Sequence, residues 1–347
     1  MRGGLRWMRR EDRLIPKREA RLTAIVISKE GILLAAFAVL VMVFTAVFVS
    51  SLDEVKRVFY GVRPGVTLEG RQVAGLMPQE VRRIVETMAE EERVAPKDAM
   101  LFKETGEIIA EEPGTDIDVD LTVARVMQAK PGEAVELARV TVMPTITRRL
   151  FSPVYKVDTD QKVMALAVNV AWGEEYLPGM LEILRANNVK ATFFIDGEWA
   201  QKYPDSVKLL AAEGHDIGNH GAKHVHVAKM PEAEIRDLIL RNEDLLGRLG
   251  AKPRKLFAPP YGECNQTVTS AAASLGYTTI MWTIDTIDWN TKDHQKVIDR
   301  VVRKMSPGAI VLMHPTEVTI KALPAIIETA RKSGYQFATI SELVGAR

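Results

Sequence analysis

The chain has 347 residues, of which 47% are hydrophobic and 26% are charged. This length and composition exclude a disordered or fibrous protein and leave room for two folded domains. The formal net charge is +1, so nothing indicates nucleic acid as a partner. Cys264 is the only cysteine, which excludes an intramolecular disulfide and a cysteine-based zinc site. Any metal would have to be bound by histidine and carboxylate side chains.

Residues 1–30 form a basic segment with nine Lys and Arg against four Asp and Glu. The segment Gly31–Ser50 follows without a single charge, and at 1.5 Å per residue its 20 residues can cross a hydrocarbon core of about 30 Å. A cleaved signal peptide is the alternative, although its apolar core is normally only about 7 to 15 residues long. The positive-inside rule predicts a cytoplasmic basic tail over 1–30, a transmembrane helix over 31–50, and all later residues outside the cell.

Residues 58–147 contain short alternating stretches, a helical pattern over Pro78–Glu91 and several Pro-Gly turns. This pattern predicts a small α+β module. Its landmarks resemble the peptidoglycan-binding module found beside transpeptidase domains in bacterial wall proteins: Pro64-Gly65-Val66, Ala74-Gly75-Leu76, Glu80 and Gly114-Thr115-Asp116. A plain spacer domain is the alternative interpretation.

Residues 158–347 alternate apolar runs with helical patterns. Buried strands are predicted within 163–170, 190–197, 215–220, 255–260, 277–285 and 308–314. Helices are predicted over Leu177–Asn188, Pro231–Leu249, Thr267–Leu275 and His294–Met305. Continuous apolar strands separated by helices indicate a parallel sheet covered on both faces, so the fold class is α/β. The length favours a compact (β/α) barrel of about seven strands.

Polar residues lie at or just after the ends of these predicted strands: Asn169, His220, His224, Asp285 and His314. In a parallel barrel the carboxyl ends of the strands converge on one mouth, where catalytic groups gather. His220 and His224 have the i, i+4 spacing that can direct two imidazoles at one divalent metal ion. A chance pair of surface histidines is the alternative.

Five sequence motifs resemble, in their order and spacing, those of the polysaccharide deacetylase family, also called NodB-type or carbohydrate esterase family 4. They are WGEEYLPGMLEILRANNVKATFFIDG, GHDIGNHGAKH, FAPPYG, TIDTIDW and VLMHP. Trp172-Gly173-Glu174-Glu175 is most similar to the branch associated with sporulation in Gram-positive bacteria. The resemblance implies removal of acetyl groups from N-acetylated cell-wall glycan, or peptidoglycan, by hydrolysis of a C–N amide bond.

The resemblance also implies roles for residues. The family's first motif is an Asp-Asp pair, a general base followed by a metal ligand, and here the two positions are Asn169 and Val170. His220 and His224 match the family's two histidine ligands of zinc or a similar divalent ion. The family's arginine that holds the base is replaced by Ala258.

On the other side of the implied site the family pattern is kept. The resemblance implies that Pro260 shapes the groove and that the backbone N–H of Tyr261 helps to bind the oxyanion. It also implies that His314 is the general acid, tuned by the carboxylate of Asp285. Tyr261 and Trp289 could stack on a sugar ring, or simply pack at the barrel mouth.

The changes at Asn169, Val170 and Ala258 form one set, because an arginine that orients a carboxylate has no partner once that carboxylate is an amide. An amide cannot deprotonate water, and two imidazoles alone predict weak or absent metal binding. Two hypotheses follow. The protein is a wall-facing deacetylase with impaired activity, or it is a non-catalytic relative that binds glycan or acts in sporulation or wall assembly.

Overall fold

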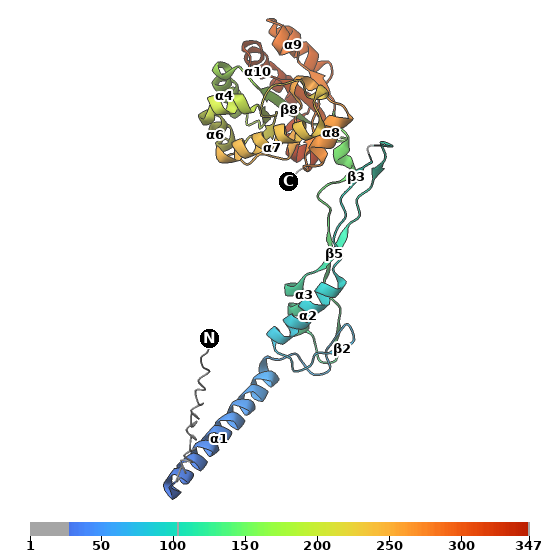
Figure 1. The fold of residues 1–347 in the computed structure, drawn as a ribbon. Coiled ribbons are helices and arrows are strands. Elements are labelled where there is room, and N and C mark those ends of the chain that lie inside the picture. Colours follow the sequence, from blue (N-terminus) through green and yellow to red (C-terminus); the bar gives the residue numbers. More distant parts are fainter. Residues whose placement is uncertain (1–27, 103, 346–347) are drawn as a thin grey trace, which may run out of the picture. The chain divides into compact units, whose positions relative to one another are not determined.

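The computed structural model of the protein describes residues 28–102 and 104–345. These residues form two compact units. The first contains residues 28–87 and 119–137, and the second contains residues 88–118 and 138–345. Figure 1 shows the elements in chain order.

Helix α1 (Lys29–Tyr60) contains the predicted apolar segment 31–50. Ser28 caps its first turn, since the side-chain oxygen accepts a hydrogen bond from Gly31 N at 3.1 Å. The 32 residues extend about 48 Å, and the apolar stretch is exposed, so by length and composition this helix could span a membrane. Residues 1–27 of the predicted basic tail lie outside the described residues.

The end of α1 is fastened to the rest of the first unit by Arg57. Its guanidinium makes two hydrogen bonds to the carboxylate of Glu80, at 2.6 and 2.7 Å, and a third to the carbonyl oxygen of Gly75. Glu80 also accepts from Met77 N at 2.8 Å, and these donors lower the pKa of Glu80 to about 2. A bidentate ion pair between Arg57 and Glu80 therefore joins α1 directly to the folded part of the first unit.

Short strands and two helices complete the small module. Strand β1 (Thr67–Leu68) pairs with β2 (Arg71–Gln72) and with β6 (Ala134–Val135), and the helices are α2 (Pro78–Glu92) and α3 (Val119–Gln128). In the second unit β3 (Met100–Leu101) pairs with β4 (Ile108–Ile109), and β5 (Gly114–Ile117) pairs with β7 (Arg139–Val142). Residues 58–147 thus contain helices and short strands, and they are divided between the two units.

The rest of the second unit is a curled parallel sheet. Seven strands follow one another in the order β12-β11-β10-β9-β8-β14-β13, and β15 adds to the start of β8. Their bounds are β8 (Val163–Val170), β9 (Thr192–Ile195), β10 (Asp216–Asn219), β11 (Leu256–Phe257), β12 (Thr278–Thr279), β13 (Ile284–Asp285), β14 (Ala309–Met313) and β15 (Gln336–Ala338). The prediction of a (β/α) barrel of about seven strands is confirmed, and the seven strands form a curled half-barrel.

Helices surround this sheet (Figure 1). The α-helices are α4 (Leu177–Ala186), α5 (Gly197–Lys202), α6 (Pro204–Ala212), α7 (Glu232–Arg248), α8 (Gln266–Ala273), α9 (His294–Val302), α10 (Glu317–Lys332) and α11 (Ile340–Val344). Short 3₁₀ turns are η1 (Arg148–Phe151), η2 (Glu174–Tyr176), η3 (Val227–Lys229), η4 (Pro260–Gly262) and η5 (Asp288–Asn290). The four predicted helices correspond to α4, α7, α8 and α9.

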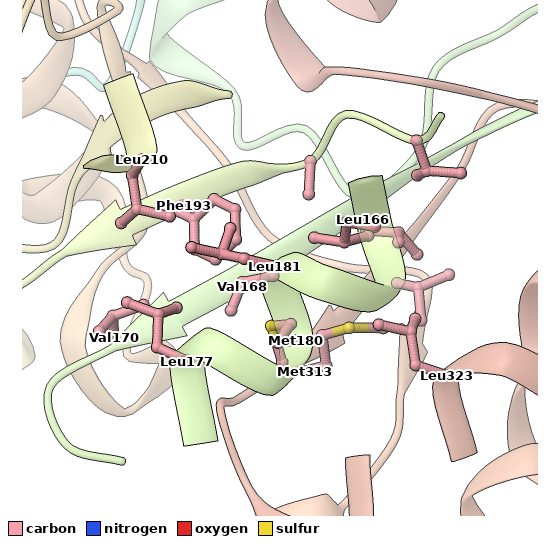
Figure 2. Packing of buried hydrophobic residues seen from close by; sticks show 14 of the residues in the cluster. Leu166, Val168, Val170, Leu177, Met180, Leu181, Phe193, Leu210, Met313 and Leu323 are labelled. Atoms are coloured by element: carbon pink, nitrogen blue, oxygen red, sulfur yellow. The ribbon is translucent and has the colours of Figure 1, made fainter. Parts of the chain in front are cut away.

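Strand β8 lies in the middle of the sheet and is buried on both faces. Side chains alternate along a strand, and Val168 and Val170 belong to the apolar cluster that includes α4, as Figure 2 shows. Ala165 and Ala167 belong to a different cluster, inside the curl of the sheet. The same alternation directs Asn169 to the inside and Val170 to the helix side.

The segment 277–285 was predicted as one strand, and this prediction is wrong. It forms β12 and β13, which lie at opposite ends of the strand order. Between them Met281 N donates to the carbonyl of Val154, and Thr283 N donates to the carbonyl of Ile310. The backbone therefore leaves β11 and reaches β14, which an unbroken apolar pattern does not reveal.

Asp196 follows β9 and begins α5, where its Oδ1 accepts from Trp199 N at 3.0 Å. The side chain is only 2% exposed, and among the described residues its Oδ2 has no hydrogen-bond partner. Burial raises the pKa of Asp196 to about 6, against the opposing effect of the Trp199 N–H. An ionised carboxylate at this position therefore destabilises the fold.

Asp196→Asn tests this consequence, since asparagine caps helices as well as aspartate does. The folded pKa lies above the unfolded value, so the penalty is absent below about pH 4, grows as pH rises to about 6, and is complete above it. We expect Asp196→Asn to raise the free energy of unfolding by about 2 to 3 kcal/mol at about pH 8 and to change it little at about pH 4. Urea denaturation of the full chain, followed by tryptophan fluorescence, measures both. Equal differences at the two pH values would contradict the account.

Candidate functional site

A cavity of about 530 Å³ opens at the carboxyl ends of the barrel strands. Seven of the eight predicted site residues line it: Asn169, His220, His224, Tyr261, Asp285, Trp289 and His314. The eighth, Pro260, is buried in η4 and is not among the lining residues. Glu174 and Glu175 begin the turn η2 and do not line the cavity either. The strand ends thus bring most of the predicted residues to one place.

Asn169 occupies the predicted base position. It is 6% exposed, and among the described residues its Oδ1 is buried without a hydrogen-bond partner. Val170, at the predicted ligand position, is fully buried and packs on the side of α4 (Figure 2). An amide and a buried valine supply neither a general base nor a metal ligand to the cavity.

The two imidazoles of the predicted metal pair lie side by side after β10, with ring centroids 5.2 Å apart. His220 Nδ1 lies 2.6 Å from the carbonyl oxygen of Ala258, which only accepts, so Nδ1 carries the hydrogen and Nε2 the lone pair. Burial lowers the pKa of His220 to about 3, and the neighbouring His224 adds to this effect. Burial also lowers the pKa of His224. Both rings are therefore neutral, the form that binds metal.

The residues present nevertheless do not fit a catalytic zinc site, which usually has three protein ligands. Within residues 28–102 and 104–345 no group of three or more His, Cys, Asp or Glu side chains is placed to hold a metal ion. Ala258, at the predicted arginine position, is 3% exposed and apolar. The water-activating half of the predicted site is thus made of Asn169, Val170 and Ala258.

Tyr261 is held in a strained conformation at the rim of the cavity. Its φ is +59°, in the left-handed region that a tyrosine rarely adopts. The ring stacks on His226, with centroids 4.3 Å apart, and meets His224 edge to face. His226 is fixed in turn by Glu263 at 2.8 Å. More than half of the Tyr261 side chain remains exposed beside the cavity.

His314 follows β14 and is held by Asp288. Its Nδ1 lies 2.8 Å from Asp288 Oδ1, and its backbone N donates to Asp288 Oδ2 at 2.6 Å. The hydroxyl of Thr319 also donates to Oδ2, and Asp288 is 2% exposed. This buried carboxylate fixes the imidazole so that Nε2 is left for the cavity.

The prediction that Asp285 tunes His314 is therefore wrong in its choice of carboxylate. Asp285 Oδ1 accepts from Ile287 N at 2.8 Å. Ile287 has a φ of +52°, and the turn it makes directs Asp288 toward the end of β14. The Asp285-x-x-Asp288 spacing left both carboxylates available, and only the turn decides between them.

Two tryptophans of the cavity were not predicted as site residues. Trp172 stacks on the imidazole of His314, with ring centroids 5.4 Å apart and planes 12° from parallel. Trp282 lines the cavity and lies against Gly262, where an added Cβ would come within 2.3 Å of the indole. Trp172 follows the buried strand β8 by two residues, and this position at a strand end could have identified it as a site residue from the sequence.

The chain is similar to several known proteins. The polysaccharide deacetylase family model matches residues 156–280. YlxY of Bacillus subtilis, an uncharacterized protein, is 35% identical over 259 residues, which are 74% of this chain and 81% of that protein. A peptidoglycan-N-acetylglucosamine deacetylase of Bacillus cereus is 32% identical over 196 residues, 55% of this chain and 92% of that enzyme.

A solved structure of BA3943 from Bacillus anthracis, described as a pseudoenzyme of carbohydrate esterase family 4, is also similar. It has a TM-score of 0.55 and 32% identity, and the match covers 76% of this chain and 94% of that one. A mutant of BA3943 is described as having restored enzymatic activity.

The variants Asp288→Asn and Asp285→Asn test which of the two carboxylates holds His314. Asparagine at 288 leaves at least one of the donors from His314 and Thr319 facing an NH₂ group, so we expect the free energy of unfolding to fall by about 1 to 3 kcal/mol. Asp285→Asn keeps the acceptor for Ile287 N and should have a clearly smaller effect. Urea denaturation measures both variants, and equal losses would refute the assignment of Asp288.

Proposed function

The chain belongs to the polysaccharide deacetylase family, and on that premise we propose that it binds cell-wall glycan with little or no ability to hydrolyse the N-acetyl groups of that glycan. The observation that carries this proposal is the composition of the cavity. Asn169 faces it where a general base is needed, while Val170 packs away from it. Relatives named peptidoglycan deacetylases support peptidoglycan as the glycan.

Hydrolysis of an N-acetyl group requires a base that takes a proton from water and an acid that protonates the leaving nitrogen. His314, fixed by Asp288, retains the acid position. The amide of Asn169 does not accept a proton near neutral pH, and loss of a general base typically costs about 10² to 10⁴ in rate. The acid half alone therefore leaves residual activity at most.

His220 and His224 are the residues that would hold a divalent ion such as zinc, with water completing the coordination. The contact of His220 Nδ1 with the carbonyl of Ala258 is of the kind that orients metal-binding imidazoles. With no third protein ligand such a site binds metal weakly. Tyr261, Trp289 and Pro260 are the proposed sugar-binding and groove-shaping residues.

The proposal includes a location. Helix α1 would anchor the chain in the plasma membrane over residues 31–50, with the tail 1–30 in the cytoplasm. The wall-binding module of residues 58–147 and the deacetylase-like domain of residues 158–347 would then face the cell wall. A role in sporulation is supported by the motif that contains Trp172.

A second candidate is a morphogenetic protein whose cavity no longer binds glycan. Tyr261 and Trp289 are 56% and 58% exposed to solvent, and this exposure favours the binding function. Rings that line a cavity and stay open to solvent are suited to stacking on sugars, since packing alone would bury them. Retention of the detergent-solubilised chain on peptidoglycan distinguishes the two.

Acetate release from N-acetylglucosamine oligomers tests the loss of activity. We expect the wild-type chain to show at most a trace, and Asn169→Asp combined with Ala258→Arg, which restores a base and its arginine, to raise the rate by about 10² or more in the presence of zinc. His314→Ala in the double variant is the control that should abolish the gain. Because Arg at 258 enters a buried apolar position, urea denaturation must first show that the double variant folds.

Robust activity of the wild-type chain would refute the proposal. It would also require another base, and Glu174 or Glu175 would have to move into the cavity.

A further inference from the structure

The walls of the cavity carry negative charge and no lysine or arginine among the twelve described residues that line it. Asp285 is the one lining residue with a carboxylate, and Asp288 lies directly behind His314 with a second. The wall around His314 is therefore the negative side of the site.

Four aromatic rings line the same cavity: Trp172, Tyr261, Trp282 and Trp289. The face of an aromatic ring carries partial negative charge and attracts cations within about 6 Å. Trp172 stacks one face on the ring of His314 and remains 43% exposed, so its other face is the one available to a cation. Rings and carboxylate together favour a cationic group over a neutral one.

The described residues that line the cavity supply no cation to an acetamido group. A carbonyl oxygen is an acceptor and is bound by cations or hydrogen-bond donors. The positions where the family resemblance places a metal ligand and an arginine are Val170 and Ala258, both buried and apolar. An acetyl carbonyl therefore finds no cation among the described residues that line the cavity, whereas an ammonium group finds the carboxylate of Asp285.

From this arrangement we infer that the cavity prefers amino sugars whose nitrogen is free, such as glucosamine residues in wall glycan, over the N-acetylated forms. The ammonium group would lie between Asp285 and the rings of Trp172 and Trp289. The inference rests on the proposed glycan binding. It also sets a place in a reaction sequence, because an N-deacetylation reaction carried out by another enzyme must supply such a ligand.

Isothermal titration calorimetry of the full chain in detergent tests the preference. Chitosan oligomers and fully N-acetylated oligomers of the same length are titrated below neutral pH, with EDTA present to remove metal. We expect the free amines to bind about tenfold or more tightly. Asp285→Asn should reduce the preference severalfold, since it removes the charge while keeping the acceptor for Ile287 N.

Asp205→Asn is the matched control, because the side chain of Asp205 is 92% exposed and does not line the cavity. It should leave the preference unchanged. Equal or tighter binding of the acetylated oligomers would overturn the inference and leave the proposed function standing. Failure of both oligomers to bind would overturn the proposed function as well. Loss of preference in Asp205→Asn as large as in Asp285→Asn would show a general charge effect and also overturn the inference.

Discussion

The alternation of side chains along β8 is the constraint on which the site depends. This strand pairs with β9 and β14 in the middle of the curled sheet and is buried on both faces. Because neighbouring residues point to opposite faces, Asn169 reaches the cavity and Val170 the core beside α4. A shift of one residue would exchange the two and bury an amide among leucines.

The second constraint is the buried carboxylate of Asp288. This carboxylate accepts three hydrogen bonds, from the backbone N of His314, from His314 Nδ1 and from the hydroxyl of Thr319. Two of them fix the position of His314. Trp172 then covers one face of the imidazole. The imidazole of His314 is consequently held on several sides. Asn169 lines the cavity with an amide, and Val170 and Ala258 are buried and apolar.

Much of this could be predicted from the sequence. Apolar strands ending in polar residues located the cavity, since the carboxyl ends of parallel strands converge. What failed depended on backbone turns. The division of residues 277–285 into β12 and β13 depends on hydrogen bonds to Val154 and Ile310, which are distant in sequence. The choice of Asp288 over Asp285 depends on the left-handed turn at Ile287. Neither is encoded in hydrophobic periodicity.

Within residues 28–102 and 104–345, no group of three or more His, Cys, Asp or Glu side chains is placed to hold a catalytic metal ion. The zinc content of the purified full chain, measured by mass spectrometry of the metal after equilibration with zinc and dialysis, tests whether the cavity holds such an ion. We expect well below one ion per chain, with little change on His220→Ala. One tightly held ion per chain that His220→Ala removes would show that the cavity is a working metal site.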